Sequence, residues 1–176
     1  MWPFFPGSRA TPGPPLPCWA FMTEHLIGVI SDTHGLLRPQ AVQALEGVEL
    51  IIHAGDIGDP KILRALKRIA PVHAVRGNTD RGGWAADLPH TLMVEVGAVH
   101  LYVLHELFCL DLDPAAAGIS AVIFGHSHSP HSERKNGVLF LNPGSAGPRR
   151  FTLPVSLALL HVQNNGLISE FVDLLK

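Results

Sequence analysis

Short apolar runs recur along the chain, and most of them end in glycine, aspartate, asparagine or histidine. The first is Ile27-Gly28-Val29-Ile30, which is followed directly by Ser31-Asp32-Thr33-His34-Gly35. A short run of this kind, rich in β-branched residues, predicts a buried strand. Asp32 and His34 are two positions apart, so both side chains leave one face if the chain stays extended. We therefore expect this strand to end in a loop that presents a carboxylate and an imidazole together.

The remainder of the first half alternates between strand and helix patterns. Residues 49–54 and 71–76 predict two further buried strands. Residues 39–46 and 60–69 predict helices, each with proline at the first helical position, and Asp59 is the N-cap of the second. This β-α-β-α-β order predicts right-handed crossovers onto a mostly parallel sheet.

The second half is dominated by hairpin patterns. Residues 91–96 and 99–104 predict a hairpin ending at His105, and residues 121–124 predict a buried strand ending at Gly125-His126-Ser127-His128. Residues 133–141 turn at Asn136-Gly137, and residues 155–162 and 167–174 predict a last hairpin around residues 164–166. A short helix is expected at residues 113–117. We therefore expect an α/β fold of two packed sheets with helices on their outer faces.

Residues 1–22 do not resemble the rest of the chain. Six prolines fall within the first 17 residues, and no helical or strand period is visible there. These prolines interrupt every candidate signal sequence, and no stretch has the roughly 20 apolar residues of a membrane span. We expect residues 1–22 to be a disordered or non-native tail, with Met22 as the functional start, and residues 23–176 to form one domain. Docking through Trp2, Phe4 and Phe5 is the alternative.

Composition limits the partners and the compartment. The formal net charge of −2 gives no reason to expect nucleic acid as a partner beyond short oligonucleotides. Cys18 and Cys109 have no CxxC spacing, which favours two thiols in a reducing compartment, and we expect a cytoplasmic protein. A homo-oligomer stays open.

The polar residues at the predicted strand ends form one set of metal-type ligands. They are Asp32, His34, Asp56, Asn78, His105, His126 and His128. A structural zinc site would need four ligands, mostly thiolate and imidazole, whereas this set is larger and has no cysteine. It suits two catalytic divalent cations bridged by one carboxylate, with Asp56 as the natural bridge. Manganese is our first choice, with iron, zinc and nickel as alternatives, because imidazole-rich sites disfavour magnesium alone.

These motifs resemble the calcineurin-like metallophosphoesterase superfamily. The chain length, the order of the motifs and the stretch Asn142-Pro143-Gly144-Ser145 are similar to its small YfcE-like phosphodiesterase branch. The resemblance implies a four-layer α/β/β/α sandwich of two mixed sheets flanked by helices. It also implies two metal sites. One takes Asp32, His34, Asp56 and His128, and the other takes Asp56, Asn78, His105 and His126. Asp56, Asn78 and His105 are the residues expected to carry catalysis.

Two positions depart from the superfamily pattern. Thr79 stands where phosphomonoesterases of this kind have a histidine that protonates the leaving oxygen, and threonine cannot be a general acid at neutral pH. The small phosphodiesterase branch also resembles this chain in lacking that histidine. Glu106 follows His105 where glycine is common, and we expect it beside the ligands or at the substrate entrance. Asp80 and Asn142 are expected to support the site, against the simpler possibility that both are turn residues.

The leading hypothesis is a hydrolase of small soluble phosphodiesters. Two cations would activate a metal-bridging hydroxide and neutralise charge on the phosphoryl oxygens. The alternative is a protein-interaction scaffold of the same fold, as in the retromer subunit that resembles it, whose metal site is degraded. The seven ligand-type residues favour the enzyme. A nuclease is a third hypothesis, which the acidic balance disfavours.

Overall fold

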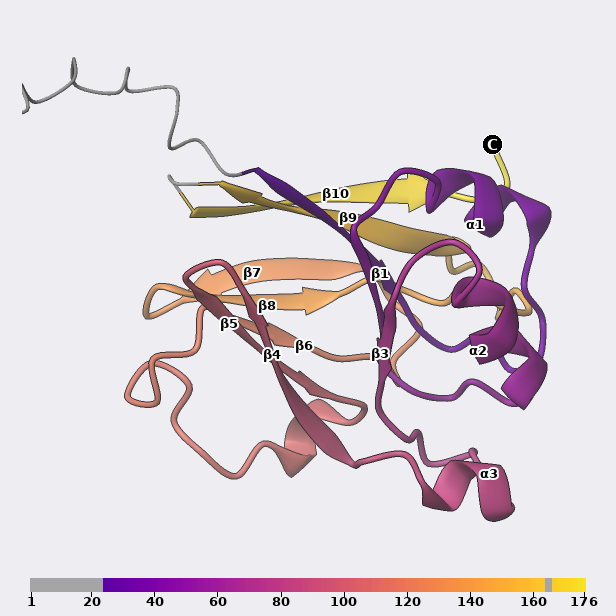
Figure 1. The fold of residues 1–176 in the computed structure, drawn as a ribbon, viewed down its shortest axis with the longest axis horizontal. Helices are drawn as coiled ribbons and strands as arrows, with labels where there is room; N and C mark the ends of the chain where they lie inside the picture. Colours follow the sequence, from indigo (N-terminus) through magenta and orange to yellow (C-terminus); the bar gives the residue numbers. More distant parts are fainter. Residues whose placement is uncertain (1–23, 164–165) are drawn as a thin grey trace, which may run out of the picture.

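A computed structural model describes residues 24–163 and 166–176. Within them, two five-stranded sheets pack face to face (Figure 1). The first sheet has the order β10-β9-β1-β2-β3 and the second has the order β4-β5-β6-β8-β7. The expected α/β fold of two mixed sheets is confirmed. The predicted tail at residues 1–22 and the turn at residues 164–165 lie outside the described residues.

The first sheet combines a parallel centre with an antiparallel edge. Strands β1 (His25–Ile30), β2 (Leu50–His53) and β3 (Val72–Ala74) run parallel. Strands β9 (Ser156–Gln163) and β10 (Gly166–Asp173) add the antiparallel edge beside β1. Helices α1 (Pro39–Ala44) and α2 (Pro60–Leu66) are the expected crossovers. The carboxylate of Asp59 accepts the N–H of Lys61 at 2.7 Å, which confirms the predicted N-cap.

The second sheet is parallel at its centre and antiparallel at both edges. Strands β5 (Val99–Leu104), β6 (Ala121–Ile123) and β8 (Val138–Asn142) run parallel, with β4 (Thr91–Val96) and β7 (His131–Lys135) outside them. The short elements α3 (Gly83–Ala86) and η2 (Leu107–Cys109) precede β4 and follow β5. Within residues 24–163 and 166–176, none of the helices has the length and hydrophobicity of a membrane span.

The predicted helix at residues 113–117 is wrong. The segment forms hydrogen-bonded turns, in which the Asp113 carboxylate accepts the N–H groups of Ala115 and Ala116. These are N-cap contacts, which start a helical turn, but Gly118 with a φ of 72° ends the segment after that one turn. The outer face of the second sheet is therefore covered partly by irregular chain, with Ile119 and Leu110 packing onto it.

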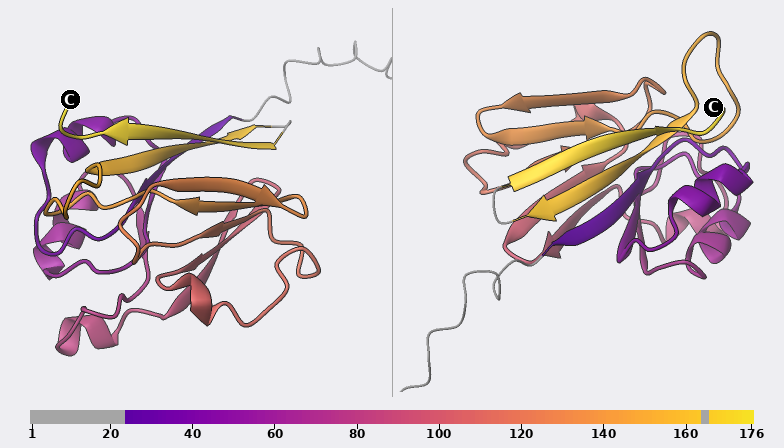
Figure 2. Two further views of the ribbon diagram at one scale, coloured as in Figure 1. Left: turned by 180° about the vertical axis from the view of Figure 1, so that it is seen from behind. Right: turned by 90° about the horizontal axis from the view of Figure 1, so that it is seen from above.

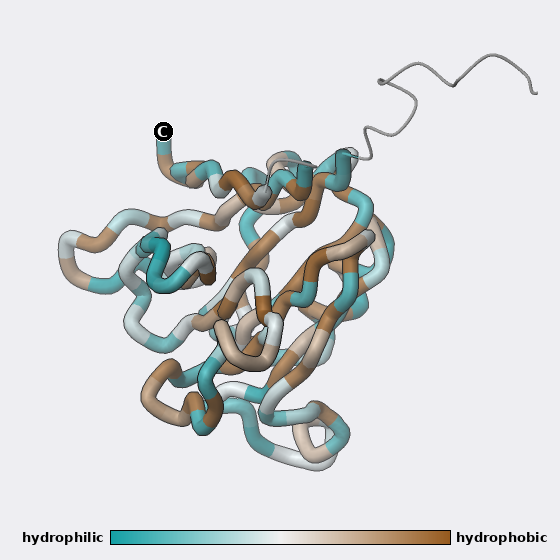
Figure 3. The backbone as a smooth tube through the Cα atoms, turned by 90° about the vertical axis from the view of Figure 1, so that its left-hand side faces the viewer, coloured by the Kyte–Doolittle hydropathy of each residue, from teal (hydrophilic) through white to brown (hydrophobic). Residues whose placement is uncertain are grey.

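Apolar side chains fill the space between the sheets. The alternation along each strand sends Ile27 and Val29 of β1 to this interior, where they join Leu101 and Val103 of β5. A second cluster, including Leu45 and Leu66, lies under the two helices. Figure 3 shows hydrophobic stretches along the strands through the middle of the view, and the views of Figure 2 show the two layers from behind and from above. The polar loops that carry the candidate ligands follow the carboxyl ends of the parallel strands.

Candidate active site

The carboxyl ends of the parallel strands of both sheets meet in one place. Four candidate ligands follow strands of the first sheet, and three follow strands of the second. Ligands at such strand ends are held by rigid elements while their loops stay free to approach one another. The structure brings all seven predicted residues into this one region.

The first group gathers around Asp32. Its Oδ1 lies 3.2 Å from His128 Nε2 and 3.9 Å from His34 Nε2, and the two histidine nitrogens are 3.3 Å apart. The other oxygen, Oδ2, accepts bonds from Ser31 Oγ at 2.7 Å and from the N–H of His126 at 3.1 Å. One oxygen is therefore fixed by the protein, and the other faces the histidines.

The second group gathers around Asn78 and His105. Asn78 Oδ1 lies 3.0 Å from His105 Nε2 and 3.3 Å from His126 Nδ1. Asp56 Oδ2 lies 3.5 Å from His105 Nε2 and 3.8 Å from His34 Nε2, so this one oxygen faces both groups. The other oxygen of Asp56 accepts the N–H of Thr79 at 2.8 Å.

Two of these close contacts, those of His105 Nε2 with Asn78 Oδ1 and Asp56 Oδ2, join hydrogen-bond acceptors when the His105 ring is neutral. His105 Nδ1 lies 2.7 Å from the carbonyl of Ala54, so this nitrogen carries the proton of the neutral ring. Nε2 then presents a lone pair to Asn78 Oδ1 and Asp56 Oδ2. Lone pairs that converge in this way repel unless a positive charge lies between them.

Buried polar atoms without a hydrogen-bond partner also indicate a cation site. Among the described residues, two buried side-chain atoms lack a hydrogen-bond partner, Asp32 Oδ1 and His128 Nδ1. An unpaired buried carboxylate oxygen is costly unless a cation or a donor satisfies it. The ligand atoms of Asp32, His34 and His128 lie within 4.8 Å of one another, as do those of Asp32, Asp56 and His105. Carboxylate, amide and imidazole donors at these spacings fit divalent metal ions.

The backbone of the ligand loops is unusual. The non-glycine residues with positive φ in the site are Asp32 (54°), His34 (44°), Asp56 (54°), His126 (69°) and His128 (58°). Residues in this left-handed region carry strain of roughly 1–3 kcal/mol each and cluster at functional sites. Asp32 and His34 therefore do not continue the extended strand as the sequence led us to expect. Their side chains are brought together by tight turns instead.

Burial and neighbouring charges shift the protonation of the site. Burial opposes the charged form of Asp56, but a hydrogen bond from the protonated His105 ring and one from the Thr79 N–H outweigh burial and hold the pKa of this carboxyl well below its usual range. Burial also opposes the charged form of His105, yet its bonds with Asp56 and Ala54 raise the pKa of the ring. Burial lowers the pKa of His34 against the pull of Asp56 and Asp32. The site therefore holds Asp56 ionised.

The predicted supporting residues hold the ligand loops. Asp80 is buried and its carboxylate accepts the N–H groups of Gly58 and Gly77, at 2.8 and 2.9 Å. Asn142 Nδ2 donates to Gly125 O at 2.7 Å and to Ser127 Oγ at 3.0 Å, which fixes the loop of His126 and His128. Thr79 is exposed at the rim of the site.

Ser145, in the stretch Asn142-Pro143-Gly144-Ser145 that the sequence singles out, donates from Oγ to the carbonyl of Asp32 at 3.0 Å. Sequence reasoning missed a second support of the site. His53 and Thr33 are in contact beneath the ligand loops, at 3.0 Å between Nε2 and Oγ1. His53 lies within the predicted strand at residues 49–54, and no motif marks it as a support of the site. The hydrogen bond from Ser31 Oγ to Asp32 can be expected because the two residues are adjacent in sequence. The contacts of Ser145 and His53 depend on how distant strands pack.

Comparisons with known proteins agree with this geometry. The model of the "Calcineurin-like phosphoesterase superfamily domain" matches residues 26–165. A probable metallophosphoesterase of Methanothermobacter thermautotrophicus is 36% identical over 162 residues, covering 84% of this chain and 91% of its own. Phosphodiesterase MJ0936 of Methanocaldococcus jannaschii is 28% identical over 137 residues, covering 67% and 82%.

Solved structures share the fold. One described as a novel archaeal phosphodiesterase has a TM-score of 0.70 at 24% identity and covers 84% of this chain and 99% of its own. Vps29 of Chaetomium thermophilum complexed with a cyclic peptide has a TM-score of 0.62 at 21% identity and covers 85% and 96%. The chain belongs to the calcineurin-like phosphoesterase superfamily, and its activity is that of a metal-dependent phosphoesterase. The predicted family is thereby confirmed.

Proposed function

We propose that the protein is a binuclear phosphodiesterase that hydrolyses a small phosphodiester. The observation that carries this proposal is the position of Asp56 Oδ2, which faces both ligand groups at 3.5 and 3.8 Å. One metal would be held by Asp32, His34, Asp56 and His128, and the other by Asp56, Asn78, His105 and His126. Two divalent cations supply a hydroxide nucleophile near neutral pH and neutralise charge on the phosphoryl oxygens.

The chain's own residues prepare this chemistry. The Thr79 N–H fixes one oxygen of Asp56, so that the other keeps its orientation toward both groups. The carbonyl of Ala54 holds the ring of His105 in the tautomer that leaves Nε2 free. Thr79 offers no group that could protonate a leaving alkoxide at neutral pH. Diesters whose leaving group has a low pKa should therefore react fastest.

The test compares bis-p-nitrophenyl phosphate with p-nitrophenyl phosphate. Metal-stripped protein is assayed before and after addition of manganese, iron, zinc or nickel. We expect diester hydrolysis to return with metal and to fall by at least about 10²-fold in Asp56→Asn. The matched control is Asp173→Asn, because Asp173 lies at the end of β10 and pairs with Lys176. Folded protein that stays inactive with every metal would contradict the proposal.

A scaffold of the same fold is the second candidate. It is supported by the likeness to Vps29, of which one structure holds a cyclic peptide, and by two very exposed aromatic side chains, Phe108 (77%) and Phe151 (92%). The intact ligand set favours the enzyme, because a protein-interaction scaffold does not require ligand residues held in strained backbone conformations. If the folded protein is inactive with manganese, iron, zinc and nickel, the scaffold becomes the favoured function.

A further inference from the structure

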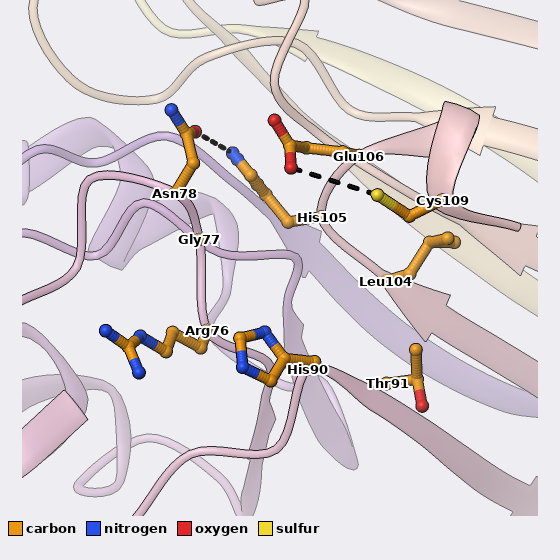
Figure 4. Close-up of a pocket in the computed structure, with 9 residues that line it drawn as sticks. All are labelled: Arg76, Gly77, Asn78, His90, Thr91, Leu104, His105, Glu106 and Cys109. Atoms are coloured by element: carbon orange, nitrogen blue, oxygen red, sulfur yellow. Dashed lines mark hydrogen bonds between the residues drawn. The ribbon is translucent and has the colours of Figure 1, made fainter. Parts of the chain in front are cut away.

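A cavity of about 580 Å³ opens directly beside the second ligand group. Asn78 and His105 form part of its wall, so the cavity and the candidate metal site are continuous (Figure 4). A volume of this size is typical of small-molecule sites. Since a bound phosphoryl group would lie at the ligands, one ester arm of the substrate has this cavity beside it.

Glu106 places a carboxylate at the junction of the cavity and the site. Its Oε1 lies 3.6 Å from His126 Nδ1, and its side chain is 25% exposed. Its Oε2 is 4.0 Å from the Cys109 thiol, which is the one hydrogen bond that the described residues give this carboxylate. An ionised carboxylate accepts up to about four bonds and donates none. Most of its bonding capacity is therefore open to a ligand.

The charges around the cavity favour a neutral arm. A carboxylate beside a phosphate site repels a second phosphate or a carboxylate on the substrate. Figure 4 shows Glu106 and Cys109 on one side of the cavity and Arg76 and His90 on the other. The Nε of Arg76 donates to the carbonyl of Asp80 at 3.2 Å, which holds the guanidinium group on the side of the cavity away from Glu106. Leu104 adds an apolar wall.

We propose that this cavity selects a neutral, hydroxyl-bearing ester arm of about nucleoside size, whose hydroxyl groups donate hydrogen bonds to Glu106. The proposal rests on the phosphodiesterase function proposed above. Glu106 is here a specificity-determining residue. It does not belong to either cluster of metal-type ligand atoms in the described residues, which are Asp32, His34 and His128, and Asp32, Asp56 and His105. A hydrogen bond to a charged group corresponds to a preference of roughly tenfold to a hundredfold.

The test uses two substrates that differ only in the hydroxyl groups. They are the p-nitrophenyl ester of adenosine 5′-monophosphate and its 2′,3′-dideoxy analogue, assayed with manganese-loaded protein. We expect kcat/KM to favour the hydroxyl-bearing ester at least about tenfold, and the ratio to fall toward one in Glu106→Ala. A substitution that damages the site in general lowers kcat/KM for both esters by the same factor, so it leaves their ratio unchanged. The matched control is Glu95→Ala, an exposed glutamate on β4 beside His100, which should keep the wild-type ratio.

A second measurement reads binding without turnover. Cys109 is exposed and lines the same cavity. Adenosine should slow its alkylation by iodoacetamide more than 2′,3′-dideoxyadenosine does, and Glu106→Ala should remove that difference. Mass analysis of the peptide that contains Cys109 separates it from Cys18.

The proposal would be overturned if the wild-type enzyme hydrolysed both esters with the same kcat/KM, or if Glu106→Ala left the ratio of the two kcat/KM values unchanged. Equal protection of Cys109 by both nucleosides would also overturn it. So would a loss of manganese affinity in Glu106→Ala, because Glu106 would then be a metal ligand. Failure of the phosphodiesterase function is distinguishable, because it abolishes hydrolysis of bis-p-nitrophenyl phosphate as well.

Discussion

His53 lies at the base of two ligand loops without facing the cation sites itself. Its Nδ1 accepts the N–H of Gly55 at 3.3 Å, so its Nε2 carries the proton and donates to Thr33 Oγ1 at 3.0 Å. Thr33 in turn donates to the carbonyl of Ile57 at 2.9 Å. The neutral ring thus ties the loop of Asp32 and His34 to the loop of Asp56. Burial lowers the pKa of His53 to about 4, because a charged imidazole is unfavourable there.

This buried ring makes stability depend on pH. The unfolded chain binds a proton at His53 below about pH 6.5, whereas the folded protein does so only below about 4. The free energy of unfolding should therefore be highest above pH 6.5 and fall by about 3 kcal/mol as the pH drops to 4. His53→Asn should be less stable at pH 7 but should lack this contribution. Urea unfolding of metal-free protein at several pH values checks it, with the exposed His73→Asn as control. Parallel pH curves for the wild type and His53→Asn would contradict the assignment.

Thr79 is the residue that should set the balance between diesters and monoesters. Its N–H holds Asp56 while its side chain stays at the exposed rim. A histidine there could protonate a poor leaving group, a contribution worth roughly 10²–10⁴-fold in rate. Thr79→His should therefore raise hydrolysis of alkyl phosphomonoesters relative to bis-p-nitrophenyl phosphate. The ratio of the two kcat/KM values is the measurement, with Thr79→Asn as the control that cannot transfer a proton. An equal ratio in both variants would count against the idea.

At the scale of the elements, the ligand loops approach one another more closely than side chains normally allow. A Cβ on Gly77 would come within 2.1 Å of the backbone nitrogen and the Oδ1 of Asp56. Glycine is thus required where the loop after β3 passes the loop after β2. A Cβ on Gly83, at the start of α3, would meet nothing within 4 Å.

These two glycines give a matched pair of substitutions. Gly77→Ala should cost roughly 1–3 kcal/mol through overpacking, and it should weaken metal binding because it pushes Asp56 away. Gly83→Ala should be neutral or stabilising by up to about 1 kcal/mol. Thermal unfolding of the metal-free proteins and manganese titration separate the two effects. If Gly77→Ala binds manganese as the wild type does, the close approach is not needed for the site.

The elements differ in how well sequence predicts them. The hairpin strands at residues 91–96 and 99–104 have the bounds that alternation and the Gly97-Ala98 turn predict. The helix expected at residues 113–117 does not form because so short a segment has little cooperativity and Gly118 ends it in the left-handed region. The strained φ values of Asp32 and Asp56 could not be predicted from sequence, because contacts between loops of different strands impose them. The seven ligand candidates were found as strand-end residues, whereas His53 and the cavity residue His90 carry no local signal.

At the scale of the whole molecule, the candidate metal centre joins the two sheets. Asp32, His34, Asp56 and Asn78 come from the first sheet, and His105, His126 and His128 come from the second. Bound cations would therefore cross-link two layers that otherwise adhere mainly through apolar side chains. Each cation binds a geometry that the unfolded chain does not provide, so binding free energy becomes folding free energy.

This cross-link predicts strong stabilisation by metal. At a free manganese concentration of 100 times Kd, each bound cation adds about 2.7 kcal/mol, or roughly 5–10 °C in Tm for a domain of this size. Scanning calorimetry with manganese and with EDTA measures the shift. Asp56→Asn should lose most of it, because this residue faces both ligand groups, whereas Asp173→Asn should keep it. A full shift in Asp56→Asn would mean that manganese binds elsewhere on the protein. If manganese raises the Tm of the wild type and of Asp173→Asn but not that of Asp56→Asn, the cation binds at the ligand loops and stabilises both sheets as one cooperative unit.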